Sequence, residues 1–459
     1  MPLRGTRGGA AVGAYAPKSI GAPYWASSYV LPSGRGLGTP RVTNNGGMYI
    51  VNTTFGIGYI NPNGNIVWQK EYGLADLSSR RGFAVDAGNN SYSFLVNSDS
   101  SVMVIYKTDQ SGNVIWQKQY TPSSGVGQLF EGFTVSQLEN VIYVAGMYFP
   151  TGGGTVLQVI KISTVDGSIL SQTALQNVSS STGVAGVGIA TSKLTAGVCY
   201  VGGYYYVDAN NSYPFLAKYN GTTLQWQVSL FYQRNPGGTY WYNRDFFYTV
   251  NVDNNDNVYV TGNIDKLTVV GGTTYAINCG LIAKYDSSGN LLWQKNVINN
   301  TGLPSSAANT AATNAVVNSA GNLFVACANY NGDTNNEIFN YNSDGTINYQ
   351  KLFTPATGLG AVDTSNNLYL SGSTQQSVSP YSIYANIYKF QNDNSTKSPI
   401  TLPNGSFTFV SDTTSFVSSA GVSTPATTSF TSGTTIPLTV SNATGTFTNT
   451  TYTSTVTLV

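Results

Sequence analysis

Nearly the same seven residues occur three times in this chain, and this repetition is the feature that most constrains its fold. The copies are GNIVWQK at 64–70, GNVIWQK at 112–118 and GNLLWQK at 289–295. They lie too far apart for a coiled coil or a short solenoid rung. Either the motif carries chemistry three times over, or it is one strand of a repeated structural unit.

A longer unit surrounds the motif, and its clearest copy runs from 249 to 296. Its first half, TVNVDNNDNVYVTGNID, predicts two strands joined by a turn, and its second half, CGLIAKYDSSGNLLWQKN, predicts two more. Each half recurs seven times. The first half occurs at 41–52, 83–97, 133–146, 189–203, 249–265, 314–329 and 360–373. The second half occurs at 56–70, 104–118, 158–172, 215–228, 279–296, 337–351 and, in degraded form, 386–400.

The turn between the last two strands of the unit carries a glycine where a tight hairpin needs a positive φ. These glycines are Gly64, Gly112, Gly167, Gly221, Gly289 and Gly345. The flanking segments are short, apolar on both faces and without a sustained 3.6-residue period, so almost no helix is expected. Such four-stranded sheets must be covered on both sides by their neighbours. We therefore predict an all-β fold, a seven-bladed β-propeller over 26–400, with an open solenoid as the alternative.

The same residues carry a family resemblance. VDNNDNVYVTG followed by LIAKYDSSGNLLWQK resembles the SBBP-type β-propeller repeat of bacterial and phage proteins. That pattern runs GN-[IV]-Y-V-[TA]-G, then a variable loop, then AKYD-x-x-G-N-x-x-W. The resemblance covers roughly residues 40–400. It implies the propeller fold and does not imply one activity.

Tryptophans and lysines recur at fixed positions of the unit. The tryptophans are Trp68, Trp116, Trp226 and Trp293. They could be stacking platforms for sugars, but we favour structural packing between blades, because Ser171 takes the same position in the third copy. The lysines are distributed around the ring, which predicts side chains lying over apolar neighbours and not a basic groove.

Departures from the repeat are the better candidates for function. The longest is SLFYQRNPGGTYWYNRDFFYTV at 229–250, and GGYYYVDANNSYPF at 202–215 is a second aromatic segment. Aromatic rings with polar tips suit carbohydrate stacking or a protein interface, and an internal plug is the alternative. Strand alternation predicts that Tyr205 points away from Tyr204 and Tyr206. The candidate binding residues are Tyr205, Tyr232, Arg234, Tyr240, Trp241, Tyr242, Arg244 and Asp245.

Several kinds of chemistry find little support. The chain has no histidine, and its three cysteines lie far apart, which predicts buried free thiols. Asp253, Asn255 and Asn257 imitate a calcium loop, but no bidentate glutamate follows, so an Asx turn is favoured. The ligands of quinone-dependent propeller dehydrogenases cannot be identified. We expect no enzyme activity, catalytic residue, metal site or cofactor.

The two ends differ from the repeats. After about residue 400 the chain is rich in Ser and Thr, with Asp412 as its sole charged residue. Short alternating stretches there predict a small β-sandwich-like domain or an oligomerisation module over 401–459. Residues 1–25 are expected to form an anchoring arm, with no signal peptide and no membrane-spanning segment.

An arm, a repeat body and a Thr-rich β tail of low charge resemble bacteriophage virion fibres and appendages. We expect a structural virion protein, made in the host cytoplasm, that joins an oligomeric assembly. Its partners would be other virion proteins, through the arm or the C-terminal domain, and host-surface glycans. A net charge of +1 argues against nucleic acid. The alternatives are a secreted or cell-surface bacterial lectin-like propeller and a polysaccharide-degrading enzyme.

Overall fold

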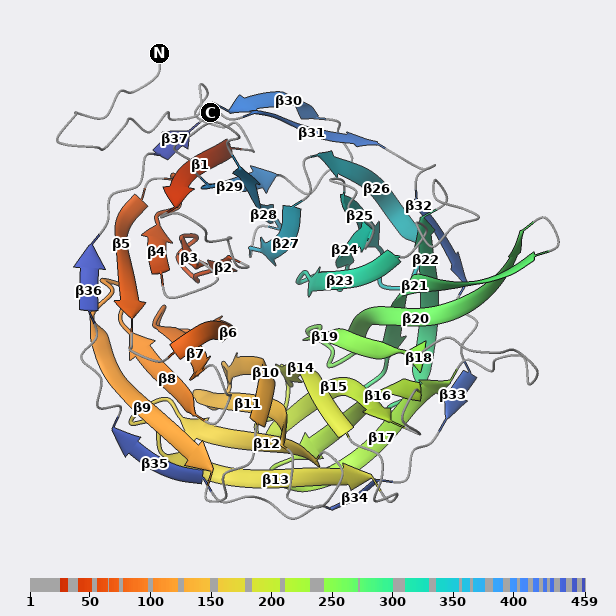
Figure 1. Cartoon of the computed structure of the whole chain (residues 1–459), viewed down its shortest axis with the longest axis horizontal. Coiled ribbons are helices and arrows are strands. Elements are labelled where there is room, and N and C mark those ends of the chain that lie inside the picture. Colours follow the sequence, from red (N-terminus) through yellow and green to blue (C-terminus); the bar gives the residue numbers. More distant parts are fainter. Residues whose placement is uncertain are drawn as a thin grey trace.

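The chain is described by a computed structural model in which the described residues form strands and turns only (Figure 1). The structure describes residues 25–31, 40–51, 56–64, 66–73, 77–97, 102–122, 128–148, 156–177, 184–206, 211–231, 243–270, 273–299, 310–329, 336–354, 357–363, 366–375, 383–390, 397–402, 405–411, 416–420, 424–426, 430–432, 438–442, 448–451 and 456–458. For residues 25–31 and for the strands after 396, the description covers the backbone. None of these segments contains a helix able to span a membrane.

The predicted glycine turns are present. Gly289 has a φ of 89°, and its N–H donates to the carbonyl of Asp286 at 3.1 Å. All six glycines named from the sequence have φ between 60° and 89°, which confirms the prediction. A side chain with a Cβ is strained in this region, so glycine fixes the turn between the third and fourth strands of the first six units.

Seven antiparallel sheets form the blades, arranged around a central axis in chain order (Figure 1). Blade 1 contains β2 (Arg41–Val42), β3 (Met48–Val51), β4 (Gly56–Ile60) and β5 (Ile66–Gly73). Blade 2 contains β6 (Leu77–Val85), β7 (Ser91–Asn97), β8 (Met103–Thr108) and β9 (Val114–Pro122). Blade 3 contains β10 (Gln128–Ser136), β11 (Val141–Tyr148), β12 (Val156–Ser163) and β13 (Ile169–Asn177).

The remaining blades follow the same plan, and the first strand of each lies nearest the axis (Figure 1). Blade 4 contains β14 (Val184–Thr191), β15 (Val198–Tyr206), β16 (Asn211–Asn220) and β17 (Thr223–Phe231), and β18 (Asn243–Arg244) pairs with β16. Blade 5 contains β19 (Phe246–Val252), β20 (Val258–Val270), β21 (Thr273–Tyr285) and β22 (Leu291–Asn299). Blade 6 contains β23 (Thr310–Val317), β24 (Leu323–Asn329), β25 (Asn336–Tyr341) and β26 (Ile347–Thr354). Blade 7 contains β27 (Thr357–Val362), β28 (Leu368–Gln375) and β29 (Ile383–Phe390).

The core lies between neighbouring blades and not within one sheet. All four residues of β3 are buried, so this strand has no solvent face. One cluster joins Tyr92 and Phe94 of blade 2 to Ile142 and Ile160 of blade 3. Each sheet is therefore covered on both sides, as the apolar pattern predicted. The seven-bladed β-propeller is confirmed by the strand pairing.

The fourth strand of blade 7 comes from the other end of the chain. It is β1 (Trp25–Leu31), which pairs antiparallel with β29. The degraded seventh copy, 386–400, was read from the sequence as holding two strands of one blade. In the structure its last residues lie instead in β30 (Lys397–Leu402), which belongs to the sheet of blade 6. The ring is thus closed by a strand from before the first repeat.

The C-terminal segment surrounds the propeller (Figure 1). It contributes one further outer strand to each blade, in the reverse of chain order. These strands, which we call the belt, are β31 (Gly405–Ser411), β32 (Phe416–Ala420), β33 (Thr424–Ala426), β34 (Phe430–Ser432), β35 (Leu438–Asn442), β36 (Thr448–Thr451) and β37 (Val456–Leu458). They pair in turn with β26, β22, β17, β13, β9, β5 and β1.

The belt corrects one prediction. The segment 401–459 was expected to form a separate β-sandwich-like domain, but its strands pair with the blades and not with one another, apart from β30 with β31. Alternating short strands look the same in sequence whether they build their own sheet or extend another. An outer fourth strand presents unpaired N–H and C=O groups, and the belt satisfies them along part of each edge.

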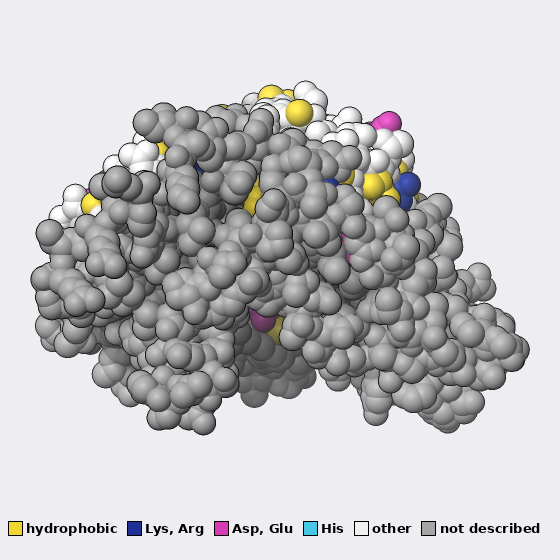
Figure 2. Space-filling model, turned by 90° about the horizontal axis from the view of Figure 1, so that it is seen from above, with side chains coloured by type: hydrophobic (Ala, Val, Ile, Leu, Met, Phe, Trp, Pro, Cys, Tyr) yellow, Lys and Arg dark blue, Asp and Glu magenta, His cyan; other side chains and the backbone are white. Residues whose placement is uncertain are grey.

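The described side chains on the surface are mostly uncharged. Among the described atoms visible in Figure 2, only a few are Lys, Arg, Asp or Glu side chains. No large field of one sign is visible there, in keeping with the low charge of the whole chain.

Candidate functional site

The four repeated tryptophans join neighbouring blades. Each donates a hydrogen bond from its indole Nε1 to a backbone carbonyl of the next blade. The acceptors are Gln110 for Trp68 (2.7 Å), Thr164 for Trp116 (2.9 Å), Ser287 for Trp226 (3.1 Å) and Ser343 for Trp293 (3.0 Å). The ring also covers the glycine of that turn, since a Cβ on Gly345 would lie 2.9 Å from Trp293. These tryptophans therefore hold the blades together.

A lysine of the third strand adds a second donor to the same carbonyl. Lys284 Nζ donates to Ser343 at 2.9 Å and lies 4.9 Å from the ring centroid of Tyr259, its partner on the second strand. Lys107 and Lys218 repeat this arrangement at Thr164 (3.1 Å) and Ser287 (2.9 Å). Burial lowers the pKa of Lys284, against the opposing charge of Asp253. We call the Tyr, Lys and Trp of one such row the inter-blade clamp.

The loop that imitates a calcium site is an Asx turn. Asp253 Oδ1 accepts the N–H groups of Asn255 and Asn257, each at 2.9 Å. Its Oδ2 accepts from Asn257 Nδ2 at 2.8 Å and from the Tyr259 hydroxyl at 3.2 Å. Burial, followed by the charge of Asp253, raises the pKa of Tyr259. Across the described ranges, no group of three or more His, Cys, Asp or Glu side chains could hold a metal ion.

The sequence-predicted binding residues have different positions. Five of them, Tyr232, Arg234, Tyr240, Trp241 and Tyr242, lie outside the described residues. For Arg244 the structure gives the backbone, which pairs with Ser212 of β16. Asp245 is only 2% exposed, so its carboxylate lies inside the protein. Tyr205 packs against Tyr213 and the core between blades 3 and 4, and its hydroxyl lies 3.4 Å from Ser229 Oγ.

The two aromatic segments meet between blades 4 and 5. Tyr206 and Tyr204 of β15 have ring centroids 5.4 Å apart, and Tyr204 lies 5.6 Å from Phe246 of β19. Phe246 in turn lies 4.4 Å from Tyr248. We call these four partly buried rings the aromatic row. As alternation predicted, Tyr205 points away from its two neighbours, which belong to the row.

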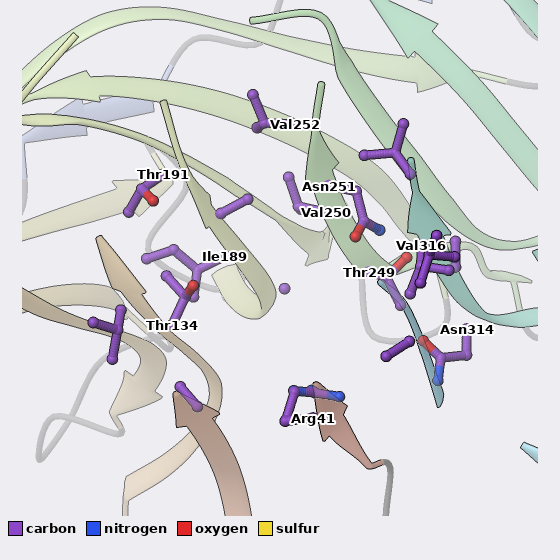
Figure 3. Close-up of a pocket in the computed structure, with 18 of the residues that line it drawn as sticks. Arg41, Thr134, Ile189, Thr191, Thr249, Val250, Asn251, Val252, Asn314 and Val316 are labelled. Atoms are coloured by element: carbon purple, nitrogen blue, oxygen red, sulfur yellow. The ribbon is translucent and has the colours of Figure 1, made fainter. Parts of the chain in front are cut away.

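A central cavity of about 580 Å³ opens beside this row (Figure 3). The first strands of all seven blades line it, from Arg41 in β2 to Val362 in β27. Tyr248, the last ring of the row, is one of its lining residues. The aromatic row therefore leads from the second strand of blade 4 into the centre of the propeller.

A β-bulge recurs in these inner strands. Six of them skip a residue at an equivalent position in their pairing with the second strand of the blade, and β6 skips a further one, Ser78. The residues skipped at the equivalent position are Arg81, Glu131, Val187, Tyr248, Thr313 and Gly360. A bulge changes the direction of a side chain and often lies near a functional site. Here it places Tyr248 and Glu131 against the cavity.

Sequence reasoning missed this cavity. Its polar lining comes from single positions of separate repeats, such as Thr134 in β10, Asn251 in β19 and Asn314 in β23 (Figure 3). One signal was available, since FFYTVNV at 246–252 breaks strict alternation where the bulge occurs. The closed propeller, which brings the first strands of the seven blades together around the cavity, could not be predicted from any single repeat.

Three of the five charged residues that line the cavity, Arg41, Asp253 and Asp363, are engaged by the fold. Arg41 Nε donates to the carbonyl of Phe83 at 3.2 Å and Nη1 to that of Pro40 at 3.3 Å, and burial lowers the pKa of its guanidinium. Asp253 is held by its Asx turn, and Asp363 accepts from the Tyr369 hydroxyl at 3.0 Å. The remaining lining offers hydroxyl, amide and aromatic groups together with the charged side chains of Glu131 and Lys193.

Comparisons with known proteins give fold-level similarity. No family model and no curated protein sequence matches the chain. The quinohemoprotein alcohol dehydrogenase from Comamonas testosteroni is similar at 12% identity with a TM-score of 0.46, over 85% of this chain and 80% of that one. A europium-containing methanol dehydrogenase is similar at 11% identity and a TM-score of 0.41, over 79% and 92%. The WD40 domain of SCAP from fission yeast is similar at 8% identity and a TM-score of 0.40, over 86% and 94%.

Proposed function

We propose that this protein is a structural, non-enzymatic component of a bacteriophage particle, which displays its propeller on the outside of the particle. We also propose that its repeat is of the SBBP type, on the motif at 249–296. The protein would be made in the host cytoplasm and carried away on the particle. It would be one of several copies in an assembly.

The observation that supports this proposal most is the double closure of the ring. β1 completes blade 7, and the belt adds an outer strand to every blade. The blades are therefore connected twice along the chain, once through the repeats and once through the belt. A particle protein is not replaced after release, so slow unfolding is the property it needs. Strand topology would have to supply it here, because Cys199, Cys279 and Cys327 are free and buried and form no disulfide.

The use of the repeated polar groups supports a non-enzymatic role. The inter-blade clamps engage lysines with backbone carbonyls of the next blade. The turn aspartates hold their own turns, as Asp253 does. The groups that recur most often thus serve the architecture.

The proposed attachment point is the N-terminal arm. The C-terminal strands pair with the chain's own blades, which leaves residues 1–24, outside the described residues, as the segment for contact with other particle proteins. Removing 1–24 should abolish incorporation into particles without changing the melting temperature of the purified chain.

The direct test is mass spectrometry of purified phage particles from the source sample. We expect peptides of this chain in a fixed ratio to the major capsid protein, and the ratio separates a capsid decoration from a tail fibre. Absence from the particles, together with the chain in culture medium of unlysed cells, would contradict the proposal. That outcome would favour the exported lectin-like propeller.

A further inference from the structure

We infer that the aromatic row and the adjoining cavity wall form a binding site for an uncharged saccharide. The inference rests on the proposed display function, because it assigns the ligand that the displayed propeller would meet. It concerns Tyr204, Tyr206, Phe246 and Tyr248 together with the polar residues of β10, β19 and β23 that line the cavity.

The aromatic row is a chain of four rings in mutual contact. Its three successive centroid separations are 5.4, 5.6 and 4.4 Å and its interplanar angles are 88°, 53° and 80°, so the rings pack against one another at steep angles and a sugar would stack on a single ring face and not on a common plane. Each ring is partly exposed, whereas Phe247, which follows Phe246 in the chain, is fully buried. Tyrosine offers an apolar face and a polar tip, which matches a sugar ring with its C–H face and its hydroxyl edge.

The cavity beside the row offers hydrogen-bonding groups without net charge. Thr134, Thr249, Asn251 and Asn314 line it from three different blades (Figure 3). An amide side chain presents both donors and an acceptor, and a hydroxyl can do either, so these groups match sugar hydroxyls. The volume of about 580 Å³ lies within the range of small-molecule sites, roughly 300–1,000 Å³.

The charges favour a neutral ligand over an anionic one. Arg41, the cation drawn in Figure 3, is oriented by two backbone carbonyls. Lys193 is a second cation in the lining, and Glu131, Asp253 and Asp363 contribute acidic groups from three other blades. Three acids against two cations leave the lining with a net negative charge, which disfavours a phosphate or carboxylate ligand and does not penalise a neutral sugar.

The test is isothermal titration of the full-length chain with maltotetraose, mannotetraose and N-acetylglucosamine tetrasaccharide, and with tetragalacturonate as an acidic probe. We expect saturable binding of at least one neutral probe and weaker binding of the acidic one. Tyr248→Ala and Tyr204→Ala should each weaken it about tenfold or more. Tyr248→Phe, which keeps the ring, should retain most of the affinity.

The matched control is Thr313→Ala, at the equivalent bulge of β23, which should change affinity less than about twofold. Melting temperatures identify any variant that fails to fold, and in that case Asn251→Ala tests the polar wall instead.

The inference is overturned if no neutral probe binds, if tetragalacturonate binds most tightly, or if the ring variants bind as the parent does. A chain found in phage particles that binds no sugar overturns this inference alone. A chain that binds sugar but is absent from particles overturns the proposed function alone.

Discussion

Trp25 stands opposite Lys389 in the pairing of β1 with β29, the same register that Trp116 holds opposite Lys107 in blade 2. Lys389 in turn pairs with Tyr369 and lies 5.3 Å from its ring centroid. The N-terminal strand therefore brings to blade 7 the tryptophan that the other complete rows carry within their own repeat. This register ties the start of the propeller to its last blade.

Removal of β1 should open the ring. Deleting residues 1–31 leaves β29 as an unpaired outer edge and removes the partner of β37, so we expect association between copies and a lower melting temperature. Light scattering coupled to size exclusion and a thermal scan measure both. The control is deletion of 1–24, which keeps β1. A 1–31 deletion that stays monomeric and melts with this control would show that β1 is dispensable.

Loss of one inter-blade clamp should weaken the fold measurably. Trp226→Ala removes the ring that covers Gly289 and the hydrogen bond to Ser287, and we expect a loss of about 3 kcal/mol in the free energy of unfolding. Trp226→Phe keeps a ring but no donor and should cost about 1 kcal/mol. Urea unfolding at equilibrium measures both.

The control for that pair is Gln225→Ala on the same strand, which is exposed and should lie within about 0.5 kcal/mol of the parent. Equal effects of Trp226→Ala and Gln225→Ala would contradict the clamp.

The repeated units could be predicted from the sequence because each contains its own local signals. Gly289 and its equivalents mark hairpins, and Trp293 and its equivalents mark the fourth strand, so type and count of strands follow from short segments. Trp25 carries the same signal, but it precedes the first repeat and no local pattern says which blade it completes. The belt was missed for the same reason, because its pairing partners lie far away in sequence.

In the candidate site, too, only the features carried by a short segment of sequence could be predicted. The aromatic segments at 202–215 and 229–250 were recognised from composition alone. That Tyr204 meets Phe246, and that Tyr248 reaches the cavity, depends on a bulge and on the packing of blade 4 against blade 5. Neither is specified by the residues nearby.

Disrupting one belt strand should first weaken the blade with which that strand pairs. In an antiparallel pair only every second residue donates its N–H to the neighbouring strand, so one of the two consecutive residues Thr439 and Val440 donates to β9. Replacing both by proline, which has no N–H, therefore removes one hydrogen bond between β35 and β9. We expect faster hydrogen exchange in 114–122 and faster unfolding, measured by exchange mass spectrometry. The matched control is Thr439→Ala with Val440→Ala. If exchange there is as slow as in this control, the belt does not protect blade 2.

The Glu139–Lys161 pair should make stability depend on acid pH. Burial alone would raise the pKa of Glu139, but hydrogen bonds from Lys161 (2.5 Å) and Tyr143 (2.6 Å) outweigh it and hold this pKa below its usual 4.5. A carboxylate with a lowered folded-state pKa stabilises the fold above the unfolded-state pKa, and the contribution is lost as the pH falls through the folded-state value.

A double-mutant cycle with Glu139→Gln and Lys161→Met measures this contribution. We expect a coupling of about 1 kcal/mol at pH 7 that declines as the pH falls below 4.5. A coupling that is the same at pH 7 and pH 3 would show that charge is not its source.

The three cysteines should be inert in the native protein. Cys199, Cys279 and Cys327 are all fully buried, and burial, with a smaller effect of Glu139, raises the pKa of Cys199 to about 12. Because the thiolate is the reactive species, an aromatic disulfide reagent should label no thiol at pH 8 in the native chain and all three in guanidinium. Melting temperatures with and without reductant should agree, since no disulfide contributes.

Rapid labelling of one thiol under native conditions would mean that a blade interface opens readily. The expectation that a doubly closed ring unfolds slowly would then be wrong.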